Sequence, residues 1–225
     1  MDGSGKQNTI ADQISARLTR QIIEGELAQG AKIIEEELAQ AWGVSRGPLR
    51  EAIRRLEGRR LLTRIPHAGV RVVKLDARML SELYVVREAL EGMSARMAAQ
   101  MMSRAEIDDL WRLLAQHEES VTNAEGKVYF QKAGDLDFHY RIASASKNQW
   151  LLQLLGEDLY QLLRMCRQRS GQHPSRPLKA LAQHRAITEA IGQRDGELAE
   201  ILMRRHISGA WQFLKAMIPE DEADS

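Results

Sequence analysis

The sequence predicts a mainly α-helical protein in which an N-terminal winged helix-turn-helix precedes an all-helical bundle. Two observations lead to this fold class. The first is a short helix, a glycine turn and a basic helix, followed by two short apolar runs around a turn; the second is that only helical periodicity continues from residue 76 onward. A chain of 225 residues can bury two separate cores. We therefore expect a domain over residues 1–75 and a second over residues 76–225.

Three helices are expected in the first domain. Thr9 is a suitable N-cap for a helix of about Ile10–Glu24, whose isoleucine and leucine residues recur at helical spacing. Apolar positions over Glu35–Trp42 predict a short second helix that stops at Gly43. Ser45 then caps a third helix. This order of helix, glycine turn and helix is typical of a helix-turn-helix, in which the later helix enters the major groove of DNA.

The third helix and the segment after it complete the motif. Arg46, Arg50 and Arg54 repeat every four residues on a different face from the inward-facing Leu49, Ile53 and Leu56. Two short runs, 61–65 and 70–73, flank a Pro-His-Ala-Gly turn, which predicts a β-hairpin wing with His67 and Gly69 near its tip.

The charge distribution indicates where nucleic acid would bind. Residues 1–74 hold 13 basic and 9 acidic residues, whereas the rest of the chain holds 19 basic and 22 acidic. Between residues 45 and 74, nine arginine or lysine residues stand against two glutamates, a local excess that releases counterions when it meets phosphates. Charge alone is equally consistent with a solvated helix face.

The segment from Gly43 to Ala52, which reads Gly-Val-Ser-Arg-Gly-Pro-Leu-Arg-Glu-Ala, resembles the recognition region of the GntR family of bacterial regulators. That family commonly has threonine where this chain has Gly47, so this chain lacks a hydroxyl that could contact DNA. The resemblance implies binding to double-stranded operator DNA. The residues implied in DNA binding lie in the third helix and the wing: Ser45, Arg46, Gly47, Arg50, Arg54, His67 and Gly69.

From residue 76 onward the sequence predicts a bundle. The expected helices span residues 77–102, 104–121, 126–145, 150–171, 177–191 and 197–218. Ser103 and Glu106 form a capping box at the start of the second. Cys166 is the only cysteine, and we expect it to be buried. Because no apolar run is long enough to span a bilayer and no secretory signal is seen, we expect a cytoplasmic protein without membrane contact.

Four residues of the bundle could bind a metal ion. Asp135 and His139 are spaced i, i+4, and His184 and His206 lie on the last two helices, which would run antiparallel. This set suits zinc, nickel or another borderline metal. Taken singly, each histidine is equally consistent with an ordinary core or surface residue.

The second domain is similar to the FCD domain of the FadR-type branch of the GntR family, in which many members bind metal. The resemblance rests on the Asp135-x-x-Phe-His139 motif and on the segments that contain His184 and His206. It implies four protein ligands on a divalent ion, with zinc first and nickel or manganese as alternatives. Positions left open on the ion would bind a small organic acid, and Arg87 and Tyr84 would contact that effector. Arg87 could instead only pair with Glu91, four residues later.

These expectations together predict a metabolite-responsive repressor that acts as a homodimer on a pseudo-palindromic operator. Two alternatives stay open. One is a metal-free DNA-binding dimer without an effector, whose histidines fill the core. The other is a metal-dependent enzyme, which we consider weaker because an enzyme needs no recognition helix and the sequence offers no well-placed general base.

Overall fold

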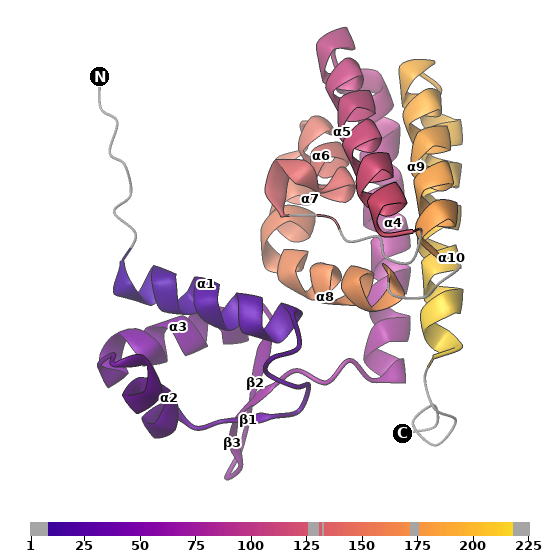
Figure 1. Ribbon diagram of the computed structural model, residues 1–225. Helices are drawn as coiled ribbons and strands as arrows, with labels where there is room; N and C mark the ends of the chain where they lie inside the picture. Colours follow the sequence, from indigo (N-terminus) through magenta and orange to yellow (C-terminus); the bar gives the residue numbers. More distant parts are fainter. Residues whose placement is uncertain (1–8, 126–130, 132, 172–175, 218–225) are drawn as a thin grey trace, which may run out of the picture. The chain divides into compact units, whose positions relative to one another are not determined.

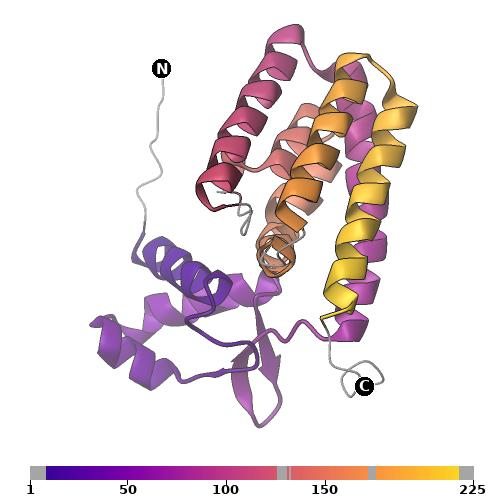
Figure 2. The same ribbon diagram turned by 45° about the vertical axis from the view of Figure 1, so that its right-hand side comes forward.

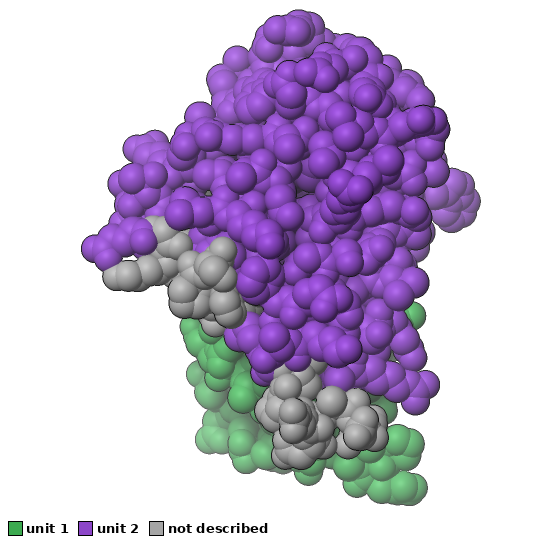
Figure 3. All heavy atoms as spheres, turned by 90° about the vertical axis from the view of Figure 1, so that its right-hand side faces the viewer, with its two compact units in different colours: residues 1–74 green, residues 75–225 purple. Residues whose placement is uncertain are grey.

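The computed structural model describes residues 9–125, 131, 133–171 and 176–217, except for the side chains of residues 135 and 169–171. It confirms the predicted fold class (Figures 1 and 2). The chain divides into two compact units, residues 1–74 and residues 75–225, which Figure 3 distinguishes by colour. Within the described ranges, no helix is long and apolar enough to cross a membrane.

The first unit packs three helices against a small sheet. Leu18, Leu49, Ile53 and Leu56 are fully buried and join the first helix to the third. Burial of such side chains is the main source of stability for a domain of this size. Its elements are α1 (Ile10–Ile23), β1 (Lys32–Ile33), α2 (Glu35–Trp42), α3 (Arg46–Gly58), β2 (Leu62–Ile65) and β3 (Gly69–Val72).

The sheet is antiparallel with the strand order β1-β3-β2. Strands β2 and β3 form the predicted wing, in which Ile65 pairs with Gly69 across the turn. His67 and Gly69 both have positive φ, of 60° and 86°, so the turn uses left-handed backbone that glycine adopts without strain. Strand β1 was not predicted. It has two residues, of which Ile33 is buried, and pairing with β3 is what makes it a strand.

The turn between α2 and α3 follows the sequence prediction with one correction. Gly43 has a φ of 63° and ends α2, as expected of a left-handed C-terminal residue. Ser45 occupies the N-cap position of α3, but its side chain makes no capping hydrogen bond. Thr9, in contrast, caps α1 in a reciprocal pair with Asp12.

The second unit is a helical bundle in which the long helices α4, α5, α9 and α10 run side by side and α8 lies across them (Figures 1 and 2). Helix α4 packs along α10, and α9 lies against both α5 and α10. Cys166 is buried, as predicted. The elements are α4 (Ala77–Met101), α5 (Arg104–Asn123), η1 (Gly134–Leu136), α6 (Phe138–Ala145), α7 (Gln149–Gln153), η2 (Leu154–Asp158), α8 (Tyr160–Gly171), α9 (Arg176–Gly192) and α10 (Gly196–Lys215).

Two helices predicted as continuous are interrupted. Of the segment predicted as one helix over 126–145, residues 126–130 and 132 lie outside the described residues. The rest breaks at Asp137, which is extended, with a φ of −107° and a ψ of 118°. Its carboxylate accepts hydrogen bonds from the backbone N–H groups of His139 and Tyr140 and so caps α6. Asp135 therefore lies in the 3-10 turn before α6, and the expectation that Asp135 and His139 share one helical turn is wrong. The segment 150–171 likewise contains a π-helical turn, η2.

Candidate metal centre and nucleic-acid interface

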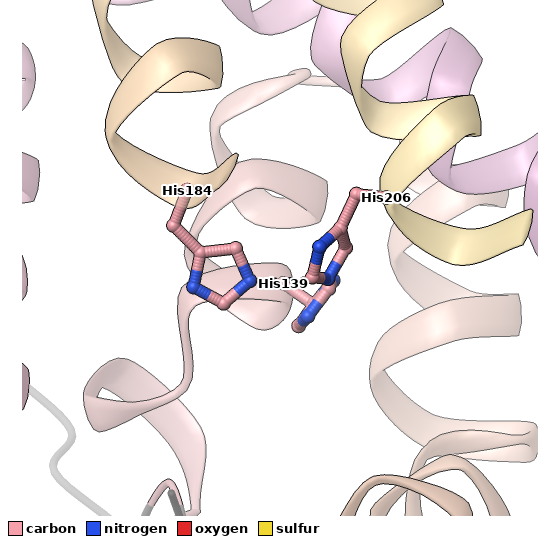
Figure 4. A group of neighbouring side chains, drawn as sticks. All are labelled: His139, His184 and His206. Atoms are coloured by element: carbon pink, nitrogen blue, oxygen red, sulfur yellow. Dashed lines mark hydrogen bonds between the residues drawn. The ribbon is translucent and has the colours of Figure 1, made fainter. Parts of the chain in front are cut away.

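Three histidines from three helices meet inside the second unit (Figure 4). His139 lies on α6, His184 on α9 and His206 on α10. One nitrogen atom from each ring lies within 4.8 Å of the other two, and the Nε2 atoms of His184 and His206 are 3.2 Å apart. The structure thus brings together the three histidines that the sequence singled out.

Each of these rings is shielded from water, since their exposed fractions are 7%, 1% and 4%. Phe138 stacks on His184 with ring centroids 4.0 Å apart. Burial lowers the pKa of His139, and burial together with the neighbouring imidazoles lowers the pKa of His184 and His206 well below their usual range. The imidazoles are therefore neutral at pH 7, which is the state that binds a metal ion.

His139 and His206 each contact a polar side chain through Nδ1. His139 Nδ1 lies 2.5 Å from Glu91 Oε2. His206 Nδ1 lies 2.9 Å from Gln183 Oε1. Such outer contacts fix the tautomer and the orientation of metal-binding histidines in proteins. The sequence reasoning did not assign either contact a role, although it noted Glu91 as a partner for Arg87.

The cluster fits a divalent transition metal. Three neutral imidazole nitrogens suit zinc and nickel better than magnesium or calcium. The 3.2 Å between two Nε2 atoms is the separation expected of two nitrogens that each bind one ion at about 2.0–2.1 Å. The side chain of Asp135, the predicted fourth ligand, lies outside the described part of the chain.

Arg87 and Tyr84, the predicted effector contacts, lie on α4 and are each 1% exposed. Arg87 Nε donates to Glu91 Oε1 at 2.8 Å, so the ion pair considered as the alternative does form. Within the described residues, however, Arg87 Nη1 and Tyr84 Oη have no hydrogen-bond partner. The Arg87 guanidinium also lies 4.6 Å from the centre of the Tyr84 ring. Burying two polar atoms without hydrogen-bond partners costs free energy of folding, and a bound ligand that forms hydrogen bonds with them would offset this cost.

The residues predicted to bind DNA in α3 are at the surface. Ser45, Arg46, Gly47, Arg50 and Arg54 are all exposed. They lie outside the buried face of α3, which leaves their side chains free to face DNA as those of a recognition helix do.

Some arginines of the first unit form ion pairs with acidic side chains. Arg50 Nε lies 2.8 Å from Glu35 Oε2, a carboxylate at the start of α2. Arg55 forms ion pairs with Asp12 of α1 and with Glu51, so it holds α1 to α3. In the wing, His67 is exposed and Gly69 is half-buried.

Comparison with known families assigns both units. Residues 10–72 match the model of the bacterial regulatory proteins of the gntR family. Residues 82–209 match the model of the FCD domain. This chain is a member of the gntR family.

Individual relatives agree with this assignment. A Paenarthrobacter nicotinovorans protein named "Probable D-xylose utilization operon transcriptional repressor" is 30% identical over 215 residues, which are 92% of this chain and 91% of the relative. The Nta operon transcriptional regulator of Aminobacter aminovorans is 33% identical over 178 residues, covering 79% and 81% of the two chains. The solved structure of E. coli McbR/YncC shares the fold, with a TM-score of 0.71 and 20% identity over 93% of this chain and 98% of that one.

Membership in the gntR family settles the class of protein. The chain is a DNA-binding transcription regulator, as the sequence predicted, and the enzyme alternative is set aside because the family and the relatives are regulators. All three histidines fall within the FCD region.

Proposed function

We propose that this regulator is a repressor whose FCD domain binds a divalent metal ion and, through it, a small organic acid that alters operator binding. The observation that carries the proposal is the convergence of three buried histidine rings, from three helices, on one point. Zinc is the first choice, with nickel and manganese as alternatives. A divalent ion held by these histidines would supply the Lewis acidity that binds the effector carboxylate.

The residues of the site have separate tasks in this proposal. His139, His184 and His206 hold the ion, and Asp135 supplies a fourth ligand. Arg87 Nη1 and Tyr84 Oη bind the carboxylate of the effector, because both are buried on α4 and neither has a hydrogen-bond partner within the described residues. A guanidinium and a hydroxyl both donate hydrogen bonds, which matches an acid that only accepts them.

The DNA-binding part of the proposal assigns residues 1–75 to the operator. A homodimer formed through residues 76–225 would present two copies of α3 to a pseudo-palindromic site in double-stranded DNA, in the cytoplasm. Arg46 and Arg50 would contact base edges or phosphates, with Ser45, Gly47 and Arg54 beside them. His67 and Gly69 would follow the backbone from the wing tip. Repression is supported by the Paenarthrobacter relative, which is named as a transcriptional repressor.

The effector can act only if it binds one state of the regulator better than another. A ligand with equal affinity for the DNA-bound and free forms shifts no equilibrium. We propose that effector binding changes the segment at Leu75–Asp76, which leads into α4, the helix that carries Arg87.

One experiment tests the sensor. The purified protein is analysed for bound metal, and its thermal unfolding is followed with a panel of small carboxylic acids. We expect bound zinc or a related ion, and one class of acid that raises the unfolding midpoint. His184→Ala should abolish both effects. Absence of metal and of any shift would support the remaining alternative, a DNA-binding dimer whose histidines only fill the core.

A second experiment tests the docking of α3. Arg46→Ala should weaken specific operator binding by about 1–3 kcal/mol and leave the fold intact. The matched control is Arg59→Ala, at the exposed C-terminal end of the same helix. Operator affinity unchanged by Arg46→Ala would show that α3 does not enter the groove as proposed.

A further inference from the structure

Gln183 connects two neighbours of the histidine cluster. Its Oε1 atom lies 3.0 Å from Arg176 Nη1 and 2.9 Å from His206 Nδ1. Gln183 and Arg176 lie on α9, whereas His206 lies on α10. One amide oxygen therefore faces both a guanidinium and an imidazole ring.

Arg176 decides which end of the Gln183 amide faces His206. A guanidinium carries only donors, so the amide atom that faces it at 3.0 Å must be the acceptor, the oxygen. The opposite orientation would place an NH₂ group against the guanidinium, with donors facing donors. The orientation of this amide thus follows from the chemistry of Arg176.

The amide oxygen in turn decides the tautomer of His206. Because an oxygen of this kind only accepts, the His206 Nδ1 atom that faces it must carry the hydrogen. Arg176 Nη2 lies 3.5 Å from Nδ1 and 3.3 Å from the carbonyl oxygen of His206, to which it donates. A neutral imidazole with its hydrogen on Nδ1 has its lone pair on Nε2, the atom that faces His184.

We infer that Arg176 and Gln183 are positioning residues that hold His206 as the Nδ1–H tautomer and so present its Nε2 lone pair to the metal ion. This inference rests on the metal site proposed above. Gln183 would do for His206 what Glu91 does for His139, with a neutral amide in place of a carboxylate.

The burial of Arg176 supports a specific task for it. The residue is 3% exposed, and within the described part of the chain no carboxylate lies within ion-pair distance of it. Burial lowers its pKa to about 10. A guanidinium buried without an acid costs free energy that a packed apolar side chain would not. Its identified polar contacts are Gln183 and His206.

The test compares variants of Gln183 by two measurements on the full chain. The ring ¹⁵N chemical shifts of His206 in the metal-free protein report which nitrogen carries the hydrogen. Competition with a chelator gives the affinity for Zn²⁺. We expect Nδ1–H in the unsubstituted protein. Gln183→Met, of similar size but without the acceptor, should give mixed tautomers and an affinity lower by about 10–100-fold.

Further variants distinguish an effect on the His206 tautomer from a general loss of structure. Gln183→Glu keeps an acceptor and should keep both the tautomer and the Zn²⁺ affinity. Arg176→Met should release the amide of Gln183, give mixed tautomers of His206 and lower the affinity for Zn²⁺. This variant replaces Gln183→Met in the test if Gln183→Met does not fold. Gln193→Met, the same substitution at an exposed position just after α9, should change neither measurement.

The outcomes decide the inference in each case. A hydrogen on Nε2 of His206 in the unsubstituted protein would overturn it, as would a Gln183→Met variant with unchanged tautomer and unchanged Zn²⁺ affinity. If the unsubstituted protein binds no Zn²⁺, Ni²⁺ or Mn²⁺, the proposed metal site fails. The tautomer measurement then still tells whether Arg176 and Gln183 fix His206.

Discussion

Glu91 Oε2 lies 2.5 Å from His139 Nδ1, while the other oxygen of the same carboxylate accepts a hydrogen bond from Arg87 Nε at 2.8 Å. Glu91 is 3% exposed, so water does not replace either contact. The Arg87 guanidinium and the His139 ring hold the pKa of Glu91 well below its usual range, against the effect of burial. This carboxylate therefore links the proposed effector contact on α4 to a proposed metal ligand on α6.

Glu91→Gln should weaken both links. An amide offers one oxygen where the carboxylate offers two, and it leaves the buried Arg87 without a charged partner. We expect the affinity for Zn²⁺, measured by chelator competition, to fall by about 10–100-fold. The free energy of unfolding should fall by about 3–5 kcal/mol. Glu82→Gln, on the exposed side of α4, is the control. Unchanged metal affinity in Glu91→Gln would show that Glu91 does not support the site.

Tyr84→Phe should separate effector binding from stability. The substitution removes only Oη, which has no hydrogen-bond partner among the described residues, and keeps the ring contacts with Arg87 and Trp211. The free energy of unfolding without effector should therefore change by less than about 1 kcal/mol. The affinity for the effector acid should fall by about 10–100-fold, which corresponds to one hydrogen bond to a charged group.

Thermal unfolding with and without the acid measures both quantities in Tyr84→Phe. The control is Tyr140→Phe, where the ring lies against Tyr160. An undiminished effector shift in Tyr84→Phe would remove Tyr84 from the proposed effector site and leave Arg87 as its donor.

The winged helix-turn-helix of the first unit could be predicted because the sequence patterns that define it are local. Gly43 and Gly69 stand where the backbone needs positive φ, and Thr9 caps α1 with its own side chain. Strand β1 could not be predicted, because Lys32–Ile33 is too short to show alternation and becomes a strand only by pairing with β3. Non-local pairing of this kind leaves no pattern within a short segment.

The candidate site could be predicted only in part, because its ligands stand in local motifs whereas its supporting contacts are non-local. The histidines stand in motifs that resemble a known domain, and the structure brings the three rings together. The contact between Glu91 and His139 joins residues 48 positions apart, and no periodicity connects them. The break at Asp137 did have a signal, since aspartate is a favoured N-cap, but the helical period on either side hid it.

Glu35→Gln should strengthen operator binding. Arg50, whose side chain is 54% exposed, is paired with Glu35 through Nε. In the proposed complex we expect Arg50 to exchange this carboxylate for DNA. Exposed ion pairs are worth up to about 1 kcal/mol, so we expect operator affinity to rise by less than about fivefold. Fluorescence anisotropy with labelled DNA measures the change. Glu36→Gln, an exposed neighbour in the same helical turn, controls for the loss of one negative charge. Weaker binding in Glu35→Gln would mean instead that Glu35 orients Arg50 for DNA.

Lowering the pH should destabilise the metal-free protein. In the unfolded chain a histidine titrates at about 6.5, whereas burial lowers the pKa of His139, His184 and His206 in the folded protein. The unfolded chain therefore binds more protons than the folded protein as the pH falls through about 6.5. The stability that these groups provide is present above that pH and is lost below it, by up to about 1.4 kcal/mol per pH unit for each histidine.

Urea unfolding of the metal-free protein between pH 7.5 and 5.5 measures this loss, and the range stays above that in which carboxylates titrate. His184→Gln removes one of the three groups, so its free energy of unfolding should depend less steeply on pH. Bound zinc should make the free energy of unfolding of the unsubstituted protein depend more steeply on pH, because protons compete with the ion for the same nitrogens. A free energy of unfolding that stays constant or rises as the pH falls would show that these histidines are protonated in the folded protein, and would remove the basis for a metal site built on neutral imidazoles.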